Sequence, residues 1–402
     1  MTNILKILII GTRFAPIPAF EGGAIEMLTD VFLNYNSHTD IKEKYEFVVY
    51  SRFSEKIDNT LLKNYKNTEF RYIKQNNLRY KLNRIVFGVM RKFIKNKVGD
   101  EFVRAIYADL KKRKELEKYD KIIFHNNINN IEYIKQNIKG KHILHLHNDY
   151  LNIDTPNAIN IVNSLDEIWC VSNFIKLRVD EVIKNDKTKV LYNCVNINYF
   201  RKQVSKKEKE ELYDLYKMNK EDFVVLYTGR IMKEKGVEEL IKAFCTYFTN
   251  IKNAKLLIVG QPNDVNYEYY TNLKEKYSSY DKISFLGQKS HEELSRLYNI
   301  CSVQVIPSMC NEAFGLTVIE GMAAGTPIIV SDSGGIPEIV SNNCALIVKR
   351  DNIIKELVDA FDFMYKNIKS KNIIDMVNNA KNRVLDFSIE KYCETINEYL
   401  KK

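Results

Sequence analysis

The stretch SMCNEAFGLTVIEGMAAGTPIIVSDSGG, residues 308–335, carries the pattern that determines the fold class. A short apolar run at 303–306 precedes it, and a second at 327–330 lies within it. Between these two predicted strands, apolar residues recur at helical spacing until Gly325, which a proline follows two residues later. A strand, a glycine-bearing turn, a helix and a second strand in this order are typical of a parallel sheet covered by helices.

The same alternation of strands and helices runs through both halves of the chain. At 402 residues the chain is long for a single domain. We therefore predict an α/β protein with two doubly wound, Rossmann-like domains that face each other across a ligand-binding cleft. The predicted strands are 4–10, 46–50, 121–124, 142–146, 167–171 and 189–192, then 223–227, 255–259, 283–286, 303–306, 327–330 and 345–348.

A polar segment, FRKQVSKKEKEELYDLYKMNKEDF at 200–223, separates the two halves. It predicts a first domain at 1–200 and a second at 201–385, with a C-terminal helix at about 386–402 that packs back on the first. The apolar runs are shorter than the roughly 20 residues that cross a bilayer, and the N-terminus lacks the basic leader of a signal peptide. The seven cysteines are scattered, which argues against disulfides or a cysteine-bound zinc. We expect a cytoplasmic protein.

Two cations follow a predicted strand in the stretch LYTGRIMKEKGVEELIKAF. The chain contains neither G-x-G-x-x-G nor G-x-x-x-x-G-K-[ST], so a nicotinamide enzyme and a P-loop ATPase are disfavoured. Arg230 and Lys235, five residues apart on a loop between strand and helix, could instead bind both phosphates of a diphosphate. The alternative is that both are ordinary solvated loop residues.

Two acids flank the turn at Gly315 in the opening stretch. This glycine lets the backbone turn, so that free N–H groups at the start of the helix can bind an anion or a sugar hydroxyl. Glu312, just before these donors, is placed to accept hydrogen bonds from hydroxyl groups. For Glu320 a structural explanation exists, because Thr317-x-x-Glu320 has the spacing of a capping box.

The segment EAFGLTVIEGMAAGTPIIVSDSGG resembles the E-x7-E region of retaining glycosyltransferases of family 4, which have the GT-B fold. The resemblance extends to TGRIMKEKGVEELIKAF, LLIVGQ, ISFLGQKSHEELSRLYNICSVQVIPS and the N-terminal APIPAFEGGAIEML. The combination of EGGAIE with FHNN and HLHND is most similar to bacterial spore-coat-associated glycosyltransferases.

The resemblance implies a role for each matching residue of the second domain. Arg230 and Lys235 would hold the donor diphosphate and stabilise it as it leaves, so that no metal and no cofactor is expected. Glu312 would contact hydroxyls of the donor sugar, and Glu320 those of the ribose. Backbone N–H groups would meet the sugar and the phosphate, from Phe314, Gly315 and Leu316.

In the first domain, the resemblance implies that Gly22 and Gly23 close over the phosphates. His147 in HLHND matches a histidine that faces the cleft, and a purely structural histidine is the alternative. The implied reaction transfers a hexose or N-acetylhexosamine from a nucleotide sugar to a glycan or lipid-linked acceptor, with retention of the anomeric configuration. The resemblance favours a UDP-sugar as the donor. The product would belong to cell-surface polysaccharide or glycoconjugate synthesis. A nucleotide-sugar 2-epimerase and an inactive coat-associated protein of the same fold are the alternatives.

The net charge of +10 is concentrated in one segment. Between residues 71 and 121, 16 Lys and Arg stand against 6 Asp and Glu. Within it, residues 79–97 form a predicted amphipathic helix whose apolar face is surrounded by cations, which is typical of a site for an anionic membrane surface. A core-facing helix with a solvated basic side is the alternative. Nucleic acid is disfavoured, because no DNA-binding or RNA-binding motif accompanies the charge.

Overall fold

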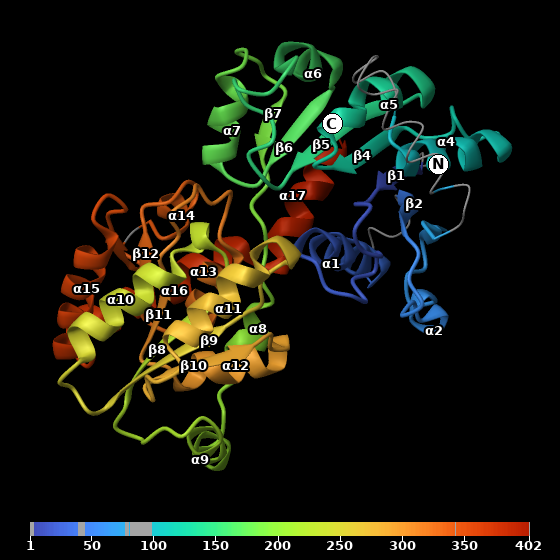
Figure 1. Ribbon diagram of the computed structural model, residues 1–402. Helices are drawn as coiled ribbons and strands as arrows, with labels where there is room; N and C mark the ends of the chain where they lie inside the picture. The colour runs from blue at the N-terminus through green and yellow to red at the C-terminus, as the bar shows by residue number, and fades with distance from the viewer. Residues whose placement is uncertain (1–3, 39–44, 77–79, 81–98, 342, 402) are drawn as a thin grey trace. The chain divides into compact units, whose positions relative to one another are not determined.

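The computed structural model describes residues 4–38, 45–76, 80, 99–341 and 343–401 (Figure 1). Contacts divide the chain into two compact units, Met1–Asn193 with Tyr392–Lys402, and Cys194–Lys391. The sequence places the corresponding boundaries at 200 and 385. Apart from Tyr80, the predicted basic helix at 79–97 lies outside the described residues. Within the described ranges, no helix has both the length and the apolar character that crossing a membrane requires.

The described part of the first unit contains one sheet of seven parallel strands, in the order β3-β2-β1-β4-β5-β6-β7. Their bounds are β1 (Leu5–Ile10), β2 (Tyr45–Arg52), β3 (Thr68–Ile73), β4 (Lys121–His125), β5 (Lys141–Leu146), β6 (Glu167–Cys170) and β7 (Thr188–Val190). The described helices are α1 (Ala24–His38), α2 (Asn59–Leu62), α4 (Glu101–Lys112), η3 (Ile128–Asn130), α5 (Ile131–Asn137), α6 (Ala158–Ser164), α7 (Asn173–Asp180) and, from Tyr392 on, α17 (Ile389–Lys401).

The central strands of this sheet are continuous buried runs, because helices cover both their faces. Helices α1 and α17 lie over the same face, where Phe32 and Ile396 line one small cavity with Ile9 and Ile123. The strand order reverses between β1 and β4. In an open α/β sheet, ligands bind at the carboxyl ends of the strands beside such a reversal.

The described part of the second unit contains one sheet of six parallel strands, in the order β10-β9-β8-β11-β12-β13. Their bounds are β8 (Phe223–Thr228), β9 (Ala254–Val259), β10 (Ile283–Gly287), β11 (Val303–Ile306), β12 (Ile328–Ser331) and β13 (Leu346–Val348). The described helices are α8 (Ile197–Phe200), α9 (Lys206–Leu215), η4 (Lys233–Lys235), α10 (Val237–Phe248), η5 (Asp264–Asn266), α11 (Tyr267–Lys276), α12 (His291–Ile300), α13 (Leu316–Ala324), α14 (Ile336–Ile339), α15 (Ile353–Asn367), α16 (Lys371–Arg383) and η6 (Val384–Phe387).

Side chains of strand β11 alternate between the two faces of this sheet. Val303 and Val305 join a buried cluster with α10 and α15, which includes Phe244 and Phe361. Gln304 points to the other face and hydrogen-bonds to residues of α12 and α13. The strand order reverses between β8 and β11, so the loops after these two strands lie where a ligand is expected in this unit.

Candidate active site

The loop after β8 carries the two predicted cations. Tyr227, at the end of the strand, donates from its hydroxyl to the carbonyl oxygen of Arg230 at 2.8 Å, and the Arg230 side chain is exposed. Lys235 ends η4, and Gly236 follows with φ +69°. A Cβ atom at Gly236 would lie 2.0 Å from the carbonyl oxygen of Pro307. This position therefore requires glycine. The close contact holds the loop after β8, which carries Arg230 and Lys235, against the loop after β11.

Lys235 and Glu312 form an ion pair between these two loops. The Lys235 Nζ lies 2.5 Å from Glu312 Oε1, and each side chain is 16% exposed. Ser308 Oγ donates to the same carboxylate oxygen at 2.5 Å. The carboxylate and the ammonium are thus held at the end of β11 while both remain accessible to a ligand.

The backbone of Glu312 is held from a third loop. Its N–H donates to Ser333 Oγ at 3.0 Å, and its carbonyl oxygen accepts from the N–H of Gly335 at 2.7 Å. Gly334 has φ +50°, and a Cβ atom there would lie 2.3 Å from the Glu312 carbonyl oxygen. Gly334 in the opening stretch is therefore explained by its close approach to Glu312.

Tyr227 lies within electrostatic range of Arg230 and of Glu312. Burial raises the pKa of its phenol well above the usual value, the charge of Glu312 raises it further, and that of Arg230 lowers it. Arg230, Lys235 and Glu312 therefore surround one region at the carboxyl ends of β8 and β11, beside the reversal of strand order.

Helix α13 begins beside this region without a side-chain cap. Gly315 is its N-cap residue, with φ +118°, and provides no side-chain cap. The preceding ring of Phe314 is buried. The first N–H groups of a helix lack partners within it, so the predicted backbone donors at Phe314, Gly315 and Leu316 lie at a helix end suited to an anion or a hydroxyl.

The predicted capping box at Thr317 and Glu320 is wrong. The helix starts at Leu316, so Thr317 is its second residue and Glu320 lies in its interior. Glu320 instead accepts a hydrogen bond from the hydroxyl of Tyr298 at 3.0 Å. Its residue is only 9% exposed. The structural explanation that the sequence offers for Glu320 is therefore removed.

Burial makes Glu320 an unusual carboxyl group. Desolvation raises its pKa to about 7, although the hydrogen bond from Tyr298 acts in the opposite direction. Tyr298 in turn contacts Thr228 Oγ1 at 2.9 Å, at the end of β8. A ligand that donates hydrogen bonds would stabilise the ionised form of this carboxyl group, because such donors replace the water that it loses on burial.

Gln304 explains the glycine that follows Glu320. Its amide nitrogen donates to Thr228 Oγ1, to the Tyr298 hydroxyl and to the carbonyl oxygen of Thr317. A Cβ atom at Gly321 would lie 1.9 Å from Gln304 Oε1. The fully buried Gln304 leaves no room for an alanine there.

The other predicted site residues belong to the first unit. Gly22 and Gly23 have φ +78° and +102° and directly precede α1. A Cβ atom at Gly23 would lie 2.2 Å from Glu26 Oε2, whose carboxylate accepts a hydrogen bond from Thr12. Both glycines are exposed, and their conformation is one that side chains rarely adopt.

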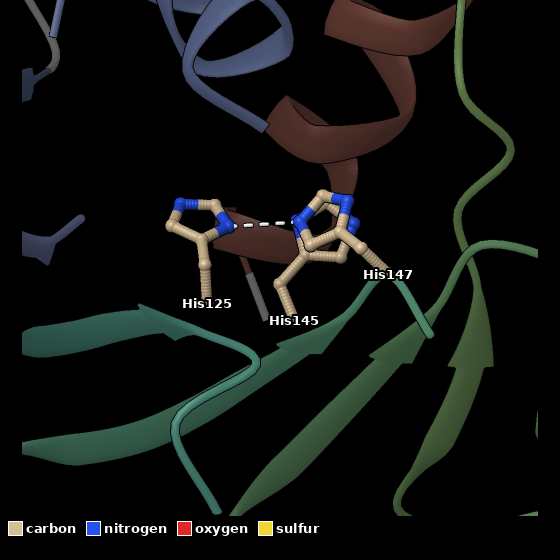
Figure 2. Close-up of side chains that lie close together, drawn as sticks. All are labelled: His125, His145 and His147. Atoms are coloured by element: carbon tan, nitrogen blue, oxygen red, sulfur yellow. Dashed lines mark hydrogen bonds between the residues drawn. The ribbon is translucent and has the colours of Figure 1, made fainter. Parts of the chain in front are cut away.

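His147 follows β5 and is 8% exposed. Its Nε2 lies 3.0 Å from Nδ1 of His125, the last residue of β4, and His145 lies beside both (Figure 2). Its backbone N–H donates to Asn126 Oδ1 at 2.7 Å. The ring is therefore engaged with a neighbouring histidine, which the sequence did not lead us to expect.

Sequence reasoning missed several residues that shape these sites. Ser308 and Ser333 position Glu312, while Tyr298 and Gln304 surround Glu320. Ser308 and Ser333 lie in the opening stretch, but no spacing rule marks a serine as a partner of a carboxylate. His125 was visible in FHNN at the end of a predicted strand, and that position was the available signal.

Comparisons with known proteins find relatives among glycosyltransferases. Residues 208–383 match the family model described as "Glycosyl transferases group 1". An uncharacterized glycosyltransferase of Methanocaldococcus jannaschii is 32% identical over 246 residues, 58% of this chain and 59% of that protein. Spore coat protein SA of Bacillus subtilis is 24% identical over 352 residues, 84% of this chain and 83% of that protein. The matches span only 56–59% of the length of the first relatives.

The fold is shared with solved structures over almost the whole chain. HepE of Anabaena, solved in complex with UDP and glucose, superimposes with a TM-score of 0.72 at 17% identity and covers 98% of this chain and 99% of its own. Both sheets of this chain match the architecture of the GT-B fold. Within this fold, residues 208–383 are the part that is similar to the group 1 glycosyl transferases.

Proposed function

We propose that this protein is a retaining glycosyltransferase that moves a hexose or N-acetylhexosamine from a nucleotide sugar to a glycan or lipid-linked acceptor in cell-surface polysaccharide or glycoconjugate synthesis. The observation that carries the proposal is the Lys235–Glu312 pair beside the uncapped start of α13. A cation, a carboxylate and the start of a helix at one strand reversal match the diphosphate and the hydroxyls of such a donor.

In this proposal, Arg230 and Lys235 bind the diphosphate and offset its charge as the glycosidic bond breaks. Glu312 accepts hydrogen bonds from hydroxyls of the donor sugar, and Glu320 accepts them from the ribose. The leaving phosphate takes the proton of the acceptor hydroxyl, so that a separate base is not needed. Because the two side-chain cations offset the leaving charge, we propose that transfer requires neither a metal nor a cofactor.

In this proposal, Gly22, Gly23 and His147 have the roles that the resemblance implies for them. The Gly22 N–H donates to the carbonyl oxygen of Ala19 at 3.0 Å, so we propose that the Gly23 N–H is the donor to a phosphate. His147 would have to contact a substrate through an atom other than Nε2, because that nitrogen pairs with His125. We also propose a cytoplasmic location, with the basic segment 79–97 bound to the inner face of the membrane.

We propose a UDP-sugar as the donor, and the similarity to a UDP-binding protein supports this choice. The test is a panel of UDP-glucose, UDP-galactose, UDP-GlcNAc and GDP-mannose, assayed by thermal shift and by slow hydrolysis. A donor at 100 times its dissociation constant would stabilise the protein by about 2.7 kcal/mol. If no nucleotide sugar stabilises the folded protein or is consumed, the proposal fails. Release of free UDP with a 2-epimerised sugar would identify an epimerase instead, and the anomeric signal of the product would decide between retention and inversion.

A further inference from the structure

We propose that His125, His145 and His147 together bind one divalent transition-metal ion, with Zn²⁺ as the best fit. The inference concerns the first unit alone. It does not rest on the proposed function, whose transfer uses Arg230 and Lys235 in place of a metal, although His147 has a part in both, here through its cluster nitrogen and there through another atom.

The strand register brings the three histidines together. His125 on β4 is the direct neighbour of His145 on β5. His147 lies two residues beyond His145 and therefore points to the same face of the sheet. One potential ligand nitrogen from each ring lies within 4.8 Å of the other two (Figure 2). These three rings form the histidine cluster.

The spacing of the nitrogens fits a common metal. Two imidazole nitrogens bound tetrahedrally at about 2.0–2.1 Å from one zinc lie about 3.4 Å apart. His125 Nδ1 and His147 Nε2 are 3.0 Å apart. All three nitrogens lie within 4.8 Å of one another, and we propose that the rings rotate to bring them to the spacing of a bound ion.

One nitrogen of the cluster lacks any partner among the described residues. His145 is 1% exposed, and its Nε2 is buried without a hydrogen bond. A buried polar atom of this kind is costly unless it is satisfied. A metal ion bound by the neighbouring nitrogens would satisfy it.

A second residue fixes the orientation of His125. Thr29 Oγ1 on α1 donates to the carbonyl oxygen of Ile25 at 2.9 Å, so its oxygen is free to accept from His125 Nε2–H at 3.3 Å. This arrangement leaves the lone pair of His125 Nδ1 directed at the cluster. Hydrogen bonds of this kind, from the second nitrogen of a ligand histidine, are typical of metal sites.

The chemistry of the three rings also suits a transition metal. Neutral imidazoles offer lone pairs to Zn²⁺, Co²⁺ or Ni²⁺ and are poor ligands for Mg²⁺.

A route for the ion exists on one side of the cluster. His125 lines a cavity of about 390 Å³ at the carboxyl ends of β1 and β4, together with Thr12, Asn126 and Asn148. Three protein ligands leave one position of a tetrahedral ion open, and solvent from this cavity can fill it. The Asn126 N–H, which donates to the His145 carbonyl oxygen at 3.0 Å, holds the loop beside the cluster in place.

The test uses the full chain, stripped with a chelator and titrated with Co²⁺ as a spectroscopic probe and with Zn²⁺ by calorimetry. We expect one ion per chain, with the visible bands of a tetrahedral site and without thiolate charge-transfer bands. Failure to bind either ion, or thiolate bands from the seven free cysteines, would overturn the proposal.

Variants locate the ion. His125→Gln, His145→Gln and His147→Gln should each weaken Zn²⁺ binding by at least about tenfold. The matched control is His142→Gln, because His142 is also buried on β5 but bonds to the carbonyl oxygen of Ile138 instead. A folded cluster variant that binds Zn²⁺ as tightly as the parent protein would contradict the assignment, as would an equal loss in the control.

Two further measurements keep the proposal testable if the cluster variants do not fold. Thr29→Val should weaken Zn²⁺ binding about 10–100-fold and shift the Co²⁺ bands, whereas Thr29→Ser should restore both. An anomalous-scattering map from zinc-soaked crystals of the parent protein should place the ion among the three rings. A zinc peak elsewhere, or none, would sink the idea.

Discussion

Lys235 and Glu312 are paired at 2.5 Å although they lie 77 positions apart in the chain. Without a ligand, the carboxylate therefore neutralises the ammonium that the proposed mechanism assigns to the diphosphate. A nucleotide diphosphate that reaches Lys235 has to share this ammonium with Glu312. In the proposed mechanism, the pair would thus lower the affinity for the diphosphate while it orders both side chains.

The first prediction concerns Glu312→Gln, which keeps the shape of the side chain but removes its charge. UDP should bind about tenfold more tightly, because the charge of Glu312 no longer competes for Lys235. A factor of ten corresponds to about 1.4 kcal/mol of binding free energy. Sugar transfer should fall by about 100-fold or more, because a charged acceptor for the sugar hydroxyls is lost. Calorimetry with UDP and steady-state turnover would measure the two effects.

Lys235→Ala provides the opposite case, and it should weaken UDP binding and abolish transfer together while the protein stays folded. Glu312→Ala should likewise abolish transfer without unfolding the protein. The control is Lys233→Ala, because Lys233 lies in the same short helix but is exposed. Normal turnover by folded Lys235→Ala or Glu312→Ala would refute the assigned roles.

The second prediction concerns stability and Glu320. Its pKa of about 7 in the folded protein lies above the unfolded value of about 4.5. The folded state thus binds the proton more tightly, and this contribution to stability is complete below about pH 4.5 and is lost as the pH rises through about 7. Glu320→Gln should flatten that part of the stability profile in urea unfolding. An unchanged profile would show that Glu320 does not titrate in this range.

The third prediction concerns the same carboxyl group in the nucleotide complex. Ribose hydroxyls would donate to the ionised form, so bound UDP should lower the pKa of Glu320. UDP should therefore bind more tightly at about pH 8 than at about pH 6, by up to about tenfold for each unit by which the pKa falls. Glu320→Gln should remove this dependence. Binding that is independent of pH in the parent protein would argue against a ribose contact.

The sequence predicted the central strands of both sheets because they are buried on both faces and form continuous apolar runs. It also predicted the end of α13 at Gly325, which has φ +77°. It missed β3 (Thr68–Ile73), an edge strand whose side chains are mostly part-exposed, so that its letters form no apolar run.

The capping box that the spacing suggests for Glu320 is wrong, and the burial of this side chain has a cause outside its own segment. The pattern Thr-x-x-Glu fits a capping box only if the helix begins after the threonine, and here it begins one residue before it. True capping boxes occur at Ser205 with Glu208 and at Ser290 with Glu293. The burial of Glu320 depends on Tyr298, which lies 22 residues away, and local spacing carries no information about such a contact.

The histidine cluster illustrates the same limit in the first unit. FHNN and HLHND each placed histidines at the end of a predicted strand. Their proximity follows from the pairing of β4 with β5 and from the register that aligns His125 with His145. Strand order and register are set by packing between distant parts of the chain, so the cluster was visible only in the structure.

The fourth prediction rests on the sequence of segment 79–97. The protein should sediment with vesicles that contain anionic lipid, and binding should fall steeply with salt. Each cation changed to glutamine should cost about 1 kcal/mol of membrane affinity. Absence of binding, or binding that survives replacement of Arg84, Arg91, Lys92 and Lys95 together, would favour a core-facing helix instead.

The fifth prediction sets helix propensity against packing at Gly321. In an ordinary helix interior, glycine to alanine is favourable by about 1 kcal/mol. At Gly321, however, the new Cβ atom would lie 1.9 Å from Gln304 Oε1, and the amide of Gln304 is held by three hydrogen bonds. Overpacking of this kind costs about 1–3 kcal/mol, so Gly321→Ala should lower the free energy of unfolding in urea.

The amide of Gln304 also contacts the Tyr298 hydroxyl that donates to Glu320. A displaced amide in Gly321→Ala should therefore disturb the carboxyl group and weaken UDP binding as well. Ala323→Gly on the same helix is the control, since it should cost stability through propensity and lost packing without touching Gln304. The contrary outcome is a Gly321→Ala protein that is as stable as the parent protein and binds UDP equally well. Gln304 would then have to be free to move. In that case, tight packing beneath Glu320 would not explain the glycine at position 321.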